Sequence, residues 1–116
     1  MELKGSKTEQ NLMTAFAGES QARNKYTYYA SKAKKDGYEQ IAAIFEETAN
    51  NEKEHEERYL RLLQNVKDDR VFHKDGDKIW ICRNCGHVYI GKDALEVCPV
   101  CKHPRSFQEV KADNYM

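Results

Sequence analysis

Four cysteines in the last third of the chain have the spacing of metal ligands. Cys82 and Cys85 form one Cys-x2-Cys pair, and Cys98 and Cys101 form a second pair after twelve intervening residues. Two such pairs can place four sulfur atoms at the corners of a tetrahedron. We therefore predict one metal ion held by the four thiolates, with two disulfides as the alternative. The spacing alone leaves the metal open, since four sulfurs in a tetrahedron suit zinc and iron alike.

The composition excludes several classes of partner. The 116 residues include 19 acidic and 19 basic side chains, a balance that argues against a basic surface for nucleic acids. No apolar run approaches the ~20 residues that a membrane-spanning helix needs, and the N-terminal residues lack the apolar core of a secretory signal. We therefore expect a cytoplasmic protein that binds neither nucleic acids nor membranes. Thiols stay reduced in the cytoplasm, which favours metal ligation over disulfides.

A second group of candidate ligands lies in the first half of the chain, at positions where charge is unexpected. On a helical projection Glu19 lies at the centre of one apolar stripe and Glu52 at the centre of another, with His55 one turn further along. A buried carboxylate is costly unless it is paired or binds a metal. A Glu-x-x-His motif, with a glutamate from a neighbouring helix, is the ligand set of di-iron carboxylate bundles. Such a spacing also arises by chance on charged helices, so ordinary surface residues are the alternative.

Two further side chains lie close to these stripes. Tyr26 is expected either to pack in the core or to hydrogen-bond a ligand carboxylate. Glu56 is a candidate to support one of the ligands. The sequence does not decide between these roles.

Two helices must position the carboxylates. Apolar residues recur at helical spacing from Lys7 to about Lys35 and again from Tyr38 to about Val66. Ser6 is suited to the N-cap of the first helix, and Gly37 follows its last turn as a C-terminal stop. Each helix would have roughly 28 residues and a length of ~42 Å. The short connection predicts an antiparallel hairpin.

A hairpin of two helices cannot enclose a core, because each apolar stripe has one neighbour and one open side. An exposed stripe of this length usually marks an interface. We therefore predict a homodimer in which two hairpins complete a four-helix bundle, by simple association or by exchange of helices. Two copies would supply two Glu19 side chains and two Glu52/His55 pairs, which complete a two-metal site on the dimer axis. The alternative is that the C-terminal module covers the stripe.

The segment around the cysteines predicts a small β module. Residues 71–74 and 78–81 flank Asp75-Gly76-Asp77, which predicts a β-hairpin with its turn at residues 75–77. So small a module lacks a large core, and we expect the bound metal to supply much of its folding free energy. The helical hairpin is expected to occupy residues 1–67 and the metal-binding module residues 68–116.

These motifs resemble those of the rubrerythrin family over almost the whole chain. Ala-Phe-Ala-Gly-Glu-Ser-Gln-Ala-Arg-Asn at residues 15–24 resembles the family's first helix, and Glu-Lys-Glu-His-Glu at residues 52–56 resembles its second. Cys-Arg-Asn-Cys-Gly at 82–86 and Cys-Pro-Val-Cys-Lys-His-Pro at 98–104 resemble its rubredoxin-like module. The resemblance implies half of a ferritin-like bundle followed by a rubredoxin-like domain.

The resemblance also implies the cofactors. Both sites would hold iron, with one Fe(Cys)4 centre per chain and one di-iron site per dimer. The di-iron ligands carried over from the family are Glu19, Glu52 and His55, and Tyr26 matches a tyrosine close to that site.

The sequence departs from the family in its number of helices. Rubrerythrins have four bundle helices in one chain, whereas this sequence predicts two, as if the middle pair were missing. The family's third helix carries a further glutamate three residues after its ligand glutamate. A dimer of this chain would present Ala22 at that position. The symmetric site would therefore have six protein ligands, and peroxide turnover is an open question.

The resemblance implies a non-haem di-iron oxidoreductase. It would reduce hydrogen peroxide, or react with oxygen, with electrons relayed through the Fe(Cys)4 centre from a separate reductase. Three alternatives stay open: a rubredoxin-type electron carrier whose helices only dimerise it, a zinc-ribbon interaction protein, and an iron-handling ferroxidase. Metal content together with molar mass in solution separates all of these except the last.

Overall fold

A computed structural model describes residues 4–112 and 114–116, which divide into two compact units. One unit comprises Gly5–Leu63 and the other comprises Gln64–Met116 with Lys4. The domain boundary between residues 67 and 68 stays a prediction. None of the described helices has an apolar stretch long enough to cross a membrane.

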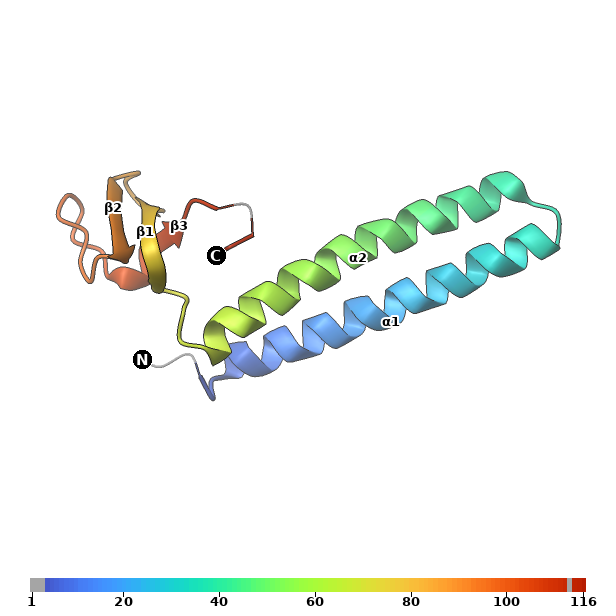
Figure 1. Cartoon of the computed structure of the whole chain (residues 1–116), viewed down its shortest axis with the longest axis horizontal. Coiled ribbons are helices and arrows are strands. Elements are labelled where there is room, and N and C mark those ends of the chain that lie inside the picture. Colours follow the sequence, from blue (N-terminus) through green and yellow to red (C-terminus); the bar gives the residue numbers. More distant parts are fainter. Residues whose placement is uncertain (1–3, 113) are drawn as a thin grey trace. The chain divides into compact units, whose positions relative to one another are not determined.

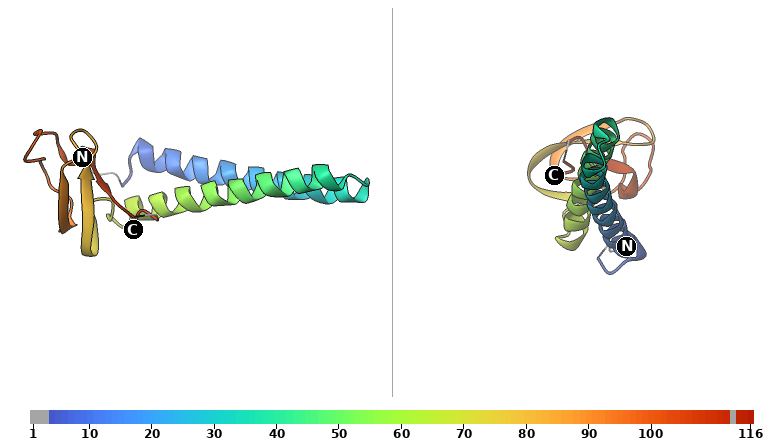
Figure 2. Two further views of the ribbon diagram at one scale, coloured as in Figure 1. Left: turned by 90° about the horizontal axis from the view of Figure 1, so that it is seen from above. Right: turned by 90° about the vertical axis from the view of Figure 1, so that its right-hand side faces the viewer.

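Two long helices form the first unit. Helix α1 spans Lys7–Lys35 and helix α2 spans Glu39–Lys67. They run antiparallel and lie side by side (Figure 1 and Figure 2). The two predicted helices are therefore confirmed, and the second begins and ends one residue later than expected.

Local signals in the sequence determine where the first helix begins and ends. The hydroxyl oxygen of Ser6 accepts a hydrogen bond from the backbone N–H of Glu9 at 3.2 Å, which satisfies one free donor of the first turn. At the other end, Gly37 has a φ of +90°. The N–H groups of Gly37 and Tyr38 bond back to carbonyls in the last turn of α1 at 3.1 and 2.9 Å. This Schellman arrangement needs a left-handed residue, which glycine adopts at little cost.

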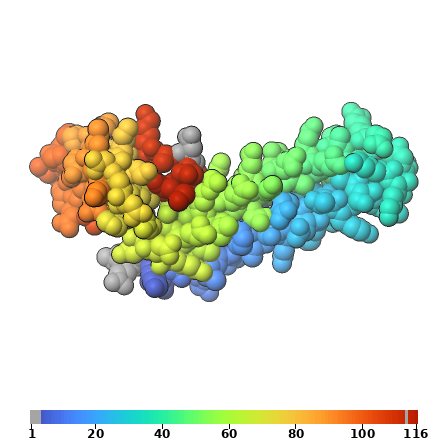
Figure 3. Space-filling model, viewed as in Figure 1, coloured from blue at the N-terminus to red at the C-terminus, as the bar shows by residue number. Residues whose placement is uncertain are grey.

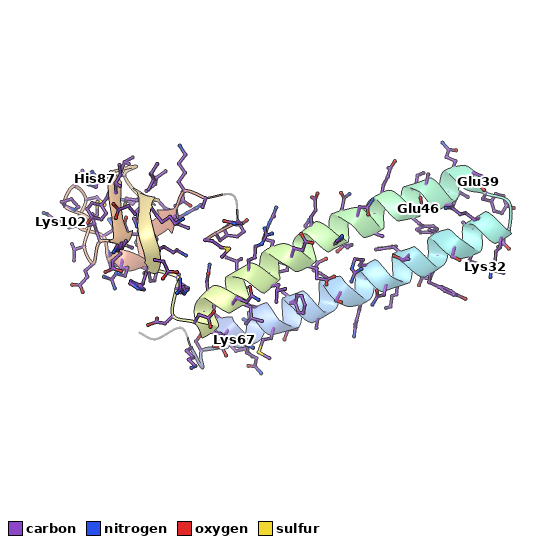
Figure 4. All side chains as sticks on the ribbon, viewed as in Figure 1. Lys32, Glu39, Glu46, Lys67, His87 and Lys102 are labelled. Carbon is purple, nitrogen blue, oxygen red and sulfur yellow. The ribbon has the colours of Figure 1, made fainter. Side chains whose placement is uncertain are left out.

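Small side chains make up most of the buried surface of the hairpin. The buried residues between them are mostly alanines: Ala30, Ala33, Ala42, Ala49 and Leu63. In the space-filling view the side chains of α1 and α2 meet along the hairpin (Figure 3). Charged side chains near the turn interact favourably with the helix dipoles. Basic Lys32 lies in the last turn of α1 and acidic Glu39 lies in the first turn of α2 (Figure 4).

Large apolar side chains of the hairpin are left exposed. Tyr29, Ile41 and Ile44 are 43%, 47% and 55% exposed. Among the described residues, every large side chain that is fully buried belongs to the second unit. We call the surface with Tyr29, Ile41 and Ile44 the open face. His55 follows Ile44 by eleven residues, about three helical turns, so it belongs to the same face of α2.

The second unit contains a three-stranded antiparallel sheet. Strand β1 spans His73–Cys82, β2 spans Val88–Asp93 and β3 spans Gln108–Val110, in the order β2-β1-β3. A 3-10 turn, η1, spans Arg105–Phe107 and leads into β3. Trp80 is fully buried at the centre, and its indole N–H donates to the carbonyl of Gly91 at 2.9 Å.

The predicted turn at residues 75–77 is wrong. These residues lie inside β1, which runs without interruption to Cys82. His73 pairs with Asp93 and Lys78 pairs with Gly91, so the stretch around Gly76 bulges out of the ladder. The chain reverses instead after Cys82, through the loop that carries the first cysteine pair. The Gly-containing segment therefore serves as a bulge that bends the strand.

The burial of the small side chains in the hairpin can be tested by overpacking. Ala42 is fully buried, whereas its neighbour Ala43 is exposed. We expect Ala42→Leu to lower the free energy of unfolding by about 1–3 kcal/mol, because the added methylenes force the helices apart. Urea unfolding followed by circular dichroism at the helical band measures this. Ala43→Leu is the matched control and should change stability little; equal losses in the two variants would contradict the packing described.

Candidate metal centres

The thiolate site is built from two loops of the same design. The N–H of Cys82 bonds to the carbonyl of His87 at 2.9 Å, and the N–H of Gly86 bonds back to Cys82 at 2.8 Å. The N–H of Cys98 bonds to His103 at 2.9 Å, and that of Lys102 bonds back to Cys98 at 3.0 Å. Gly86 and Lys102 occupy equivalent positions, with φ of +81° and +66°. Figure 4 labels one residue of each loop, His87 and Lys102.

These loops bring the four predicted ligand atoms together. The sulfur atoms of Cys82, Cys85, Cys98 and Cys101 all lie within 4.8 Å of one another. The Sγ of Cys82 lies 3.7 Å from that of Cys101, and the Sγ of Cys85 lies 3.6 Å from that of Cys98. Cys82 and Cys98 are buried, whereas Cys85 is exposed. Four soft sulfur donors in one cluster fit a tetrahedral iron or zinc ion.

Hydrogen bonds prepare two of the thiols for ligation. The side chain of Asn84, followed by the backbone N–H of His103, lowers the pKa of Cys101 to about 5. Backbone N–H groups, that of Cys101 foremost, lower the pKa of Cys98 in spite of burial. Donors aimed at a sulfur favour its thiolate, which is the form that binds metal.

The fourth thiol holds its proton more firmly. The backbone N–H of His87 favours the Cys85 thiolate, but desolvation and the neighbouring thiols, Cys98 first among them, outweigh it and raise the pKa of Cys85 to about 12. Four thiols so close together cannot all ionise unless a cation lies between them. Metal binding must therefore displace protons from the cluster.

The carboxylate site lies on the hairpin, where Glu19 of α1 faces Glu52 and His55 of α2. The Nδ1 atom of His55 lies 3.7 Å from Glu19 Oε2 and 3.8 Å from Glu52 Oε2, and the three ligand atoms lie within 4.8 Å of one another. The two carboxylate side chains are 24% and 21% exposed, whereas His55 is 46% exposed. Oxygen and imidazole donors in this arrangement fit iron. Ligation at both centres stays a prediction of the geometry.

The sequence did not lead us to predict an ion pair that lies beside the carboxylates. Arg23 Nε donates to Glu56 Oε2 at 2.8 Å, across the two helices. Each partner follows a candidate ligand by four residues, Arg23 after Glu19 and Glu56 after Glu52, so the pair lies one turn from the site. Glu56 therefore contacts an arginine. The matching offsets on the two helices were the signal that could have revealed this pair.

Tyr26 lies in an aromatic cluster. Its ring stacks on Phe45 with centroids 6.2 Å apart and meets Tyr29 edge-on at the same distance. Within residues 4–112 and 114–116, the Tyr26 hydroxyl makes no hydrogen bond to Glu19 or Glu52. The arrangement favours core packing over the hydrogen-bonding role, and a part for Tyr26 in catalysis stays a prediction.

Removal of metal from the thiolate site should unfold the second unit and spare the helices. Trp80, the single tryptophan, is buried directly before the first metal-binding loop. With chelator we expect its emission to shift towards that of exposed tryptophan, because the small sheet has little other core. The helical circular dichroism should stay unchanged. An unshifted Trp80 emission after metal analysis has confirmed loss of the ion would contradict this role of the metal.

Comparison with known sequences gives both halves of the chain the same assignment. The rubrerythrin family matches residues 10–80, and the rubrerythrin rubredoxin-like domain matches residues 80–108. Rubrerythrin-1 of Clostridium acetobutylicum is 34% identical over 192 aligned positions, which cover 97% of this chain and 98% of the relative. Rubrerythrin of Nitratidesulfovibrio vulgaris is 32% identical, with 97% and 98% covered.

The alignment with the Clostridium protein has more positions than this chain has residues, so that relative contains an internal stretch absent here. A solved structure of nigerythrin in a partially reduced state has a TM-score of 0.40 and 24% identity, and covers 90% of this chain and 86% of that one. Two family matches in tandem and full-length relatives above 30% identity show that the chain belongs to the rubrerythrin family, as a di-iron and rubredoxin-type protein.

Proposed function

We propose that this protein is a homodimeric peroxide reductase whose di-iron site is shared between two chains. The observation that carries the proposal is the grouping of Glu19, Glu52 and His55 within 4.8 Å on a hairpin with an open apolar face. Membership of the rubrerythrin family supports iron as the metal at this site and at the thiolates. The named relatives are rubrerythrins as well.

The number of ligands requires a second chain. Di-iron bundles take a glutamate from each of two helices and a Glu-x-x-His pair from each of two others. One chain offers one Glu19 and one Glu52/His55 pair, which is half of that set. A two-fold axis through the open face would duplicate the half and bury Tyr29, Ile41 and Ile44 at the same time. Ligand completion and apolar burial thus favour the same dimer.

The two iron centres have complementary chemical roles. A pair of irons held by Glu19, Glu52 and His55 of two chains would supply the two electrons that, with two protons, reduce one hydrogen peroxide to two waters. An iron held by the four thiolates would supply one-electron transfer to that site. The chain's own residues hold these groups: the carboxylates and His55 of each chain on the bundle, and the four thiolates in the sheet module. A separate reductase would supply the electrons.

The symmetric site has a simpler ligand set than a four-helix chain can build. Ala22 lies three residues after Glu19 and lines a hollow of about 270 Å³ with Tyr26 and Tyr29. No carboxylate is available there in either copy. Six protein ligands for two metals would leave coordination positions open for a small oxidant such as a peroxide.

The ligand role of Glu52 can be tested by metal analysis. We expect Glu52→Ala to lower the iron content from four to two per dimer, because the bundle metals lose a carboxylate while the thiolate centre is untouched. Peroxide turnover should fall by roughly 100-fold or more. Glu54→Ala is the matched control, since Glu54 is exposed on the same helix two residues later. Full peroxidase activity in Glu52→Ala would exclude the proposed site.

If two chains share the site, a variant that cannot dimerise should also lose its bundle iron. Ile44 is 55% exposed in the single chain, so arginine is tolerated there, but a charge on the open face is costly when a second hairpin covers it. We expect Ile44→Arg to give the molar mass of one chain and to lose the bundle iron, with Fe(Cys)4 absorption retained. Ala43→Arg, on the exposed side of α2, should stay dimeric. A monomeric Ile44→Arg protein that keeps its bundle iron would rule out the shared site.

One observation favours a second candidate function. The thiolate centre is complete within one chain and its Cys85 is exposed, whereas the carboxylate centre is only half built. A rubredoxin-type electron carrier needs nothing more. The iron content of the unmodified protein separates the two, because a carrier holds one iron per chain and the proposed reductase holds two. Peroxide should reoxidise the carrier no faster than it reoxidises an isolated Fe(Cys)4 centre in solution.

A further inference from the structure

A cationic pocket of about 170 Å³ lies in the second unit, beside the start of β1. Its polar lining comes mainly from Asn65, Arg70, Lys74, Asp75 and Lys78. All of these lie within residues 64–116, and none of them is a candidate metal ligand. The pocket is therefore distinct from both metal centres.

Lys74 is the unusual residue of this pocket. It is only 3% exposed, although lysine is rarely buried without a partner. Its ammonium donates to the backbone carbonyl of Tyr115 at 3.0 Å, and the same carbonyl accepts from Asn65 Nδ2 at 2.7 Å. An ammonium group has three N–H donors, and a carbonyl shared with an amide satisfies only one of them. The pocket is the space left for further acceptors.

Among the side chains of the lining, three are basic (Arg70, Lys74 and Lys78) and one is acidic (Asp75). The guanidinium of Arg70 binds the carboxylate of Asp75 through two hydrogen bonds of 2.7 and 2.9 Å. Within residues 4–112 and 114–116, neither Lys74 nor Lys78 forms an ion pair. Burial, followed by repulsion from Lys78 and Arg70, lowers the pKa of Lys74. An anion in the pocket would offset all of these unfavourable effects.

We propose that this pocket binds one tetrahedral oxoanion, phosphate or sulfate, either free or as the terminal group of a phosphate monoester. A pocket of about 170 Å³ has room for a small oxoanion together with some water. Lysine ammonium groups are donors that bind such oxygens well, whereas the guanidinium fork of Arg70 is already engaged by Asp75. Lys74 and Lys78 supply the unpaired charge.

Isothermal titration calorimetry with inorganic phosphate, against chloride at equal ionic strength, tests the proposal on the full-length protein. We expect saturable binding of one phosphate per chain. Lys74→Met should weaken it by at least about tenfold, because a charge-assisted hydrogen bond is lost. Lys32→Met is the control, since Lys32 is 61% exposed on the helical hairpin. Equal affinity in the two variants, or no saturable binding by the unmodified protein, overturns the proposal.

Two further arms complete the experiment. Lys78→Met should also weaken phosphate binding. If the Trp80 emission shows that Lys74→Met is unfolded, Lys78→Met is the variant that tests the proposal. Phenyl phosphate distinguishes the sources of the anion: tighter binding than inorganic phosphate indicates a monoester, and equal or weaker binding indicates a free anion. A Lys74→Met protein that is less stable but binds phosphate normally would show that Lys74 only anchors the Tyr115 carbonyl, and would refute the site.

Discussion

The helical hairpin brings two carboxylates and an imidazole together, with their ligand atoms within 4.8 Å of one another, and the rest of the hairpin must accommodate this group of charges. Glu19 and Glu52 are mostly withdrawn from water, so each loses solvation and repels the other. A positive charge between them removes both penalties. Arg23 lies one turn away, but its charge is balanced by Glu56, with which it forms an ion pair. A bound cation beside Glu19 and Glu52 would therefore stabilise the hairpin.

The two centres differ in how much of the chain they need. The thiolate cage is local: two loops of equal design, only twelve residues apart, each fold around a pair of cysteines. The carboxylate site joins residues 33 or more positions apart, and it forms only where α1 and α2 lie side by side. A local cage can be completed by one short segment. A site on a two-helix surface is open on one side, and only another surface can close it.

Much of this could be predicted from the sequence because the relevant signals are local. Ser6 and Gly37 mark the ends of α1 by capping chemistry, and the Cys-x2-Cys spacing fixes the loop geometry. The turn expected at Gly76 failed because a glycine between polar residues suits a bulge as well as a turn, and only pairing with β2 decides. The burial of Lys74 was invisible for a similar reason: it depends on the Tyr115 carbonyl, 41 residues away.

Symmetry limits what the proposed dimer can do at its metals. A four-helix chain can place different residues at related positions, because its helices have independent sequences. In a dimer of two-helix chains every ligand appears twice, so the position of Ala22 is alanine in both copies or changed in both. A single extra glutamate on one side of the site is therefore unattainable by substitution, since Ala22→Glu adds two. A duplicated hairpin joined in one chain would lift this constraint, because its two halves could then differ in sequence.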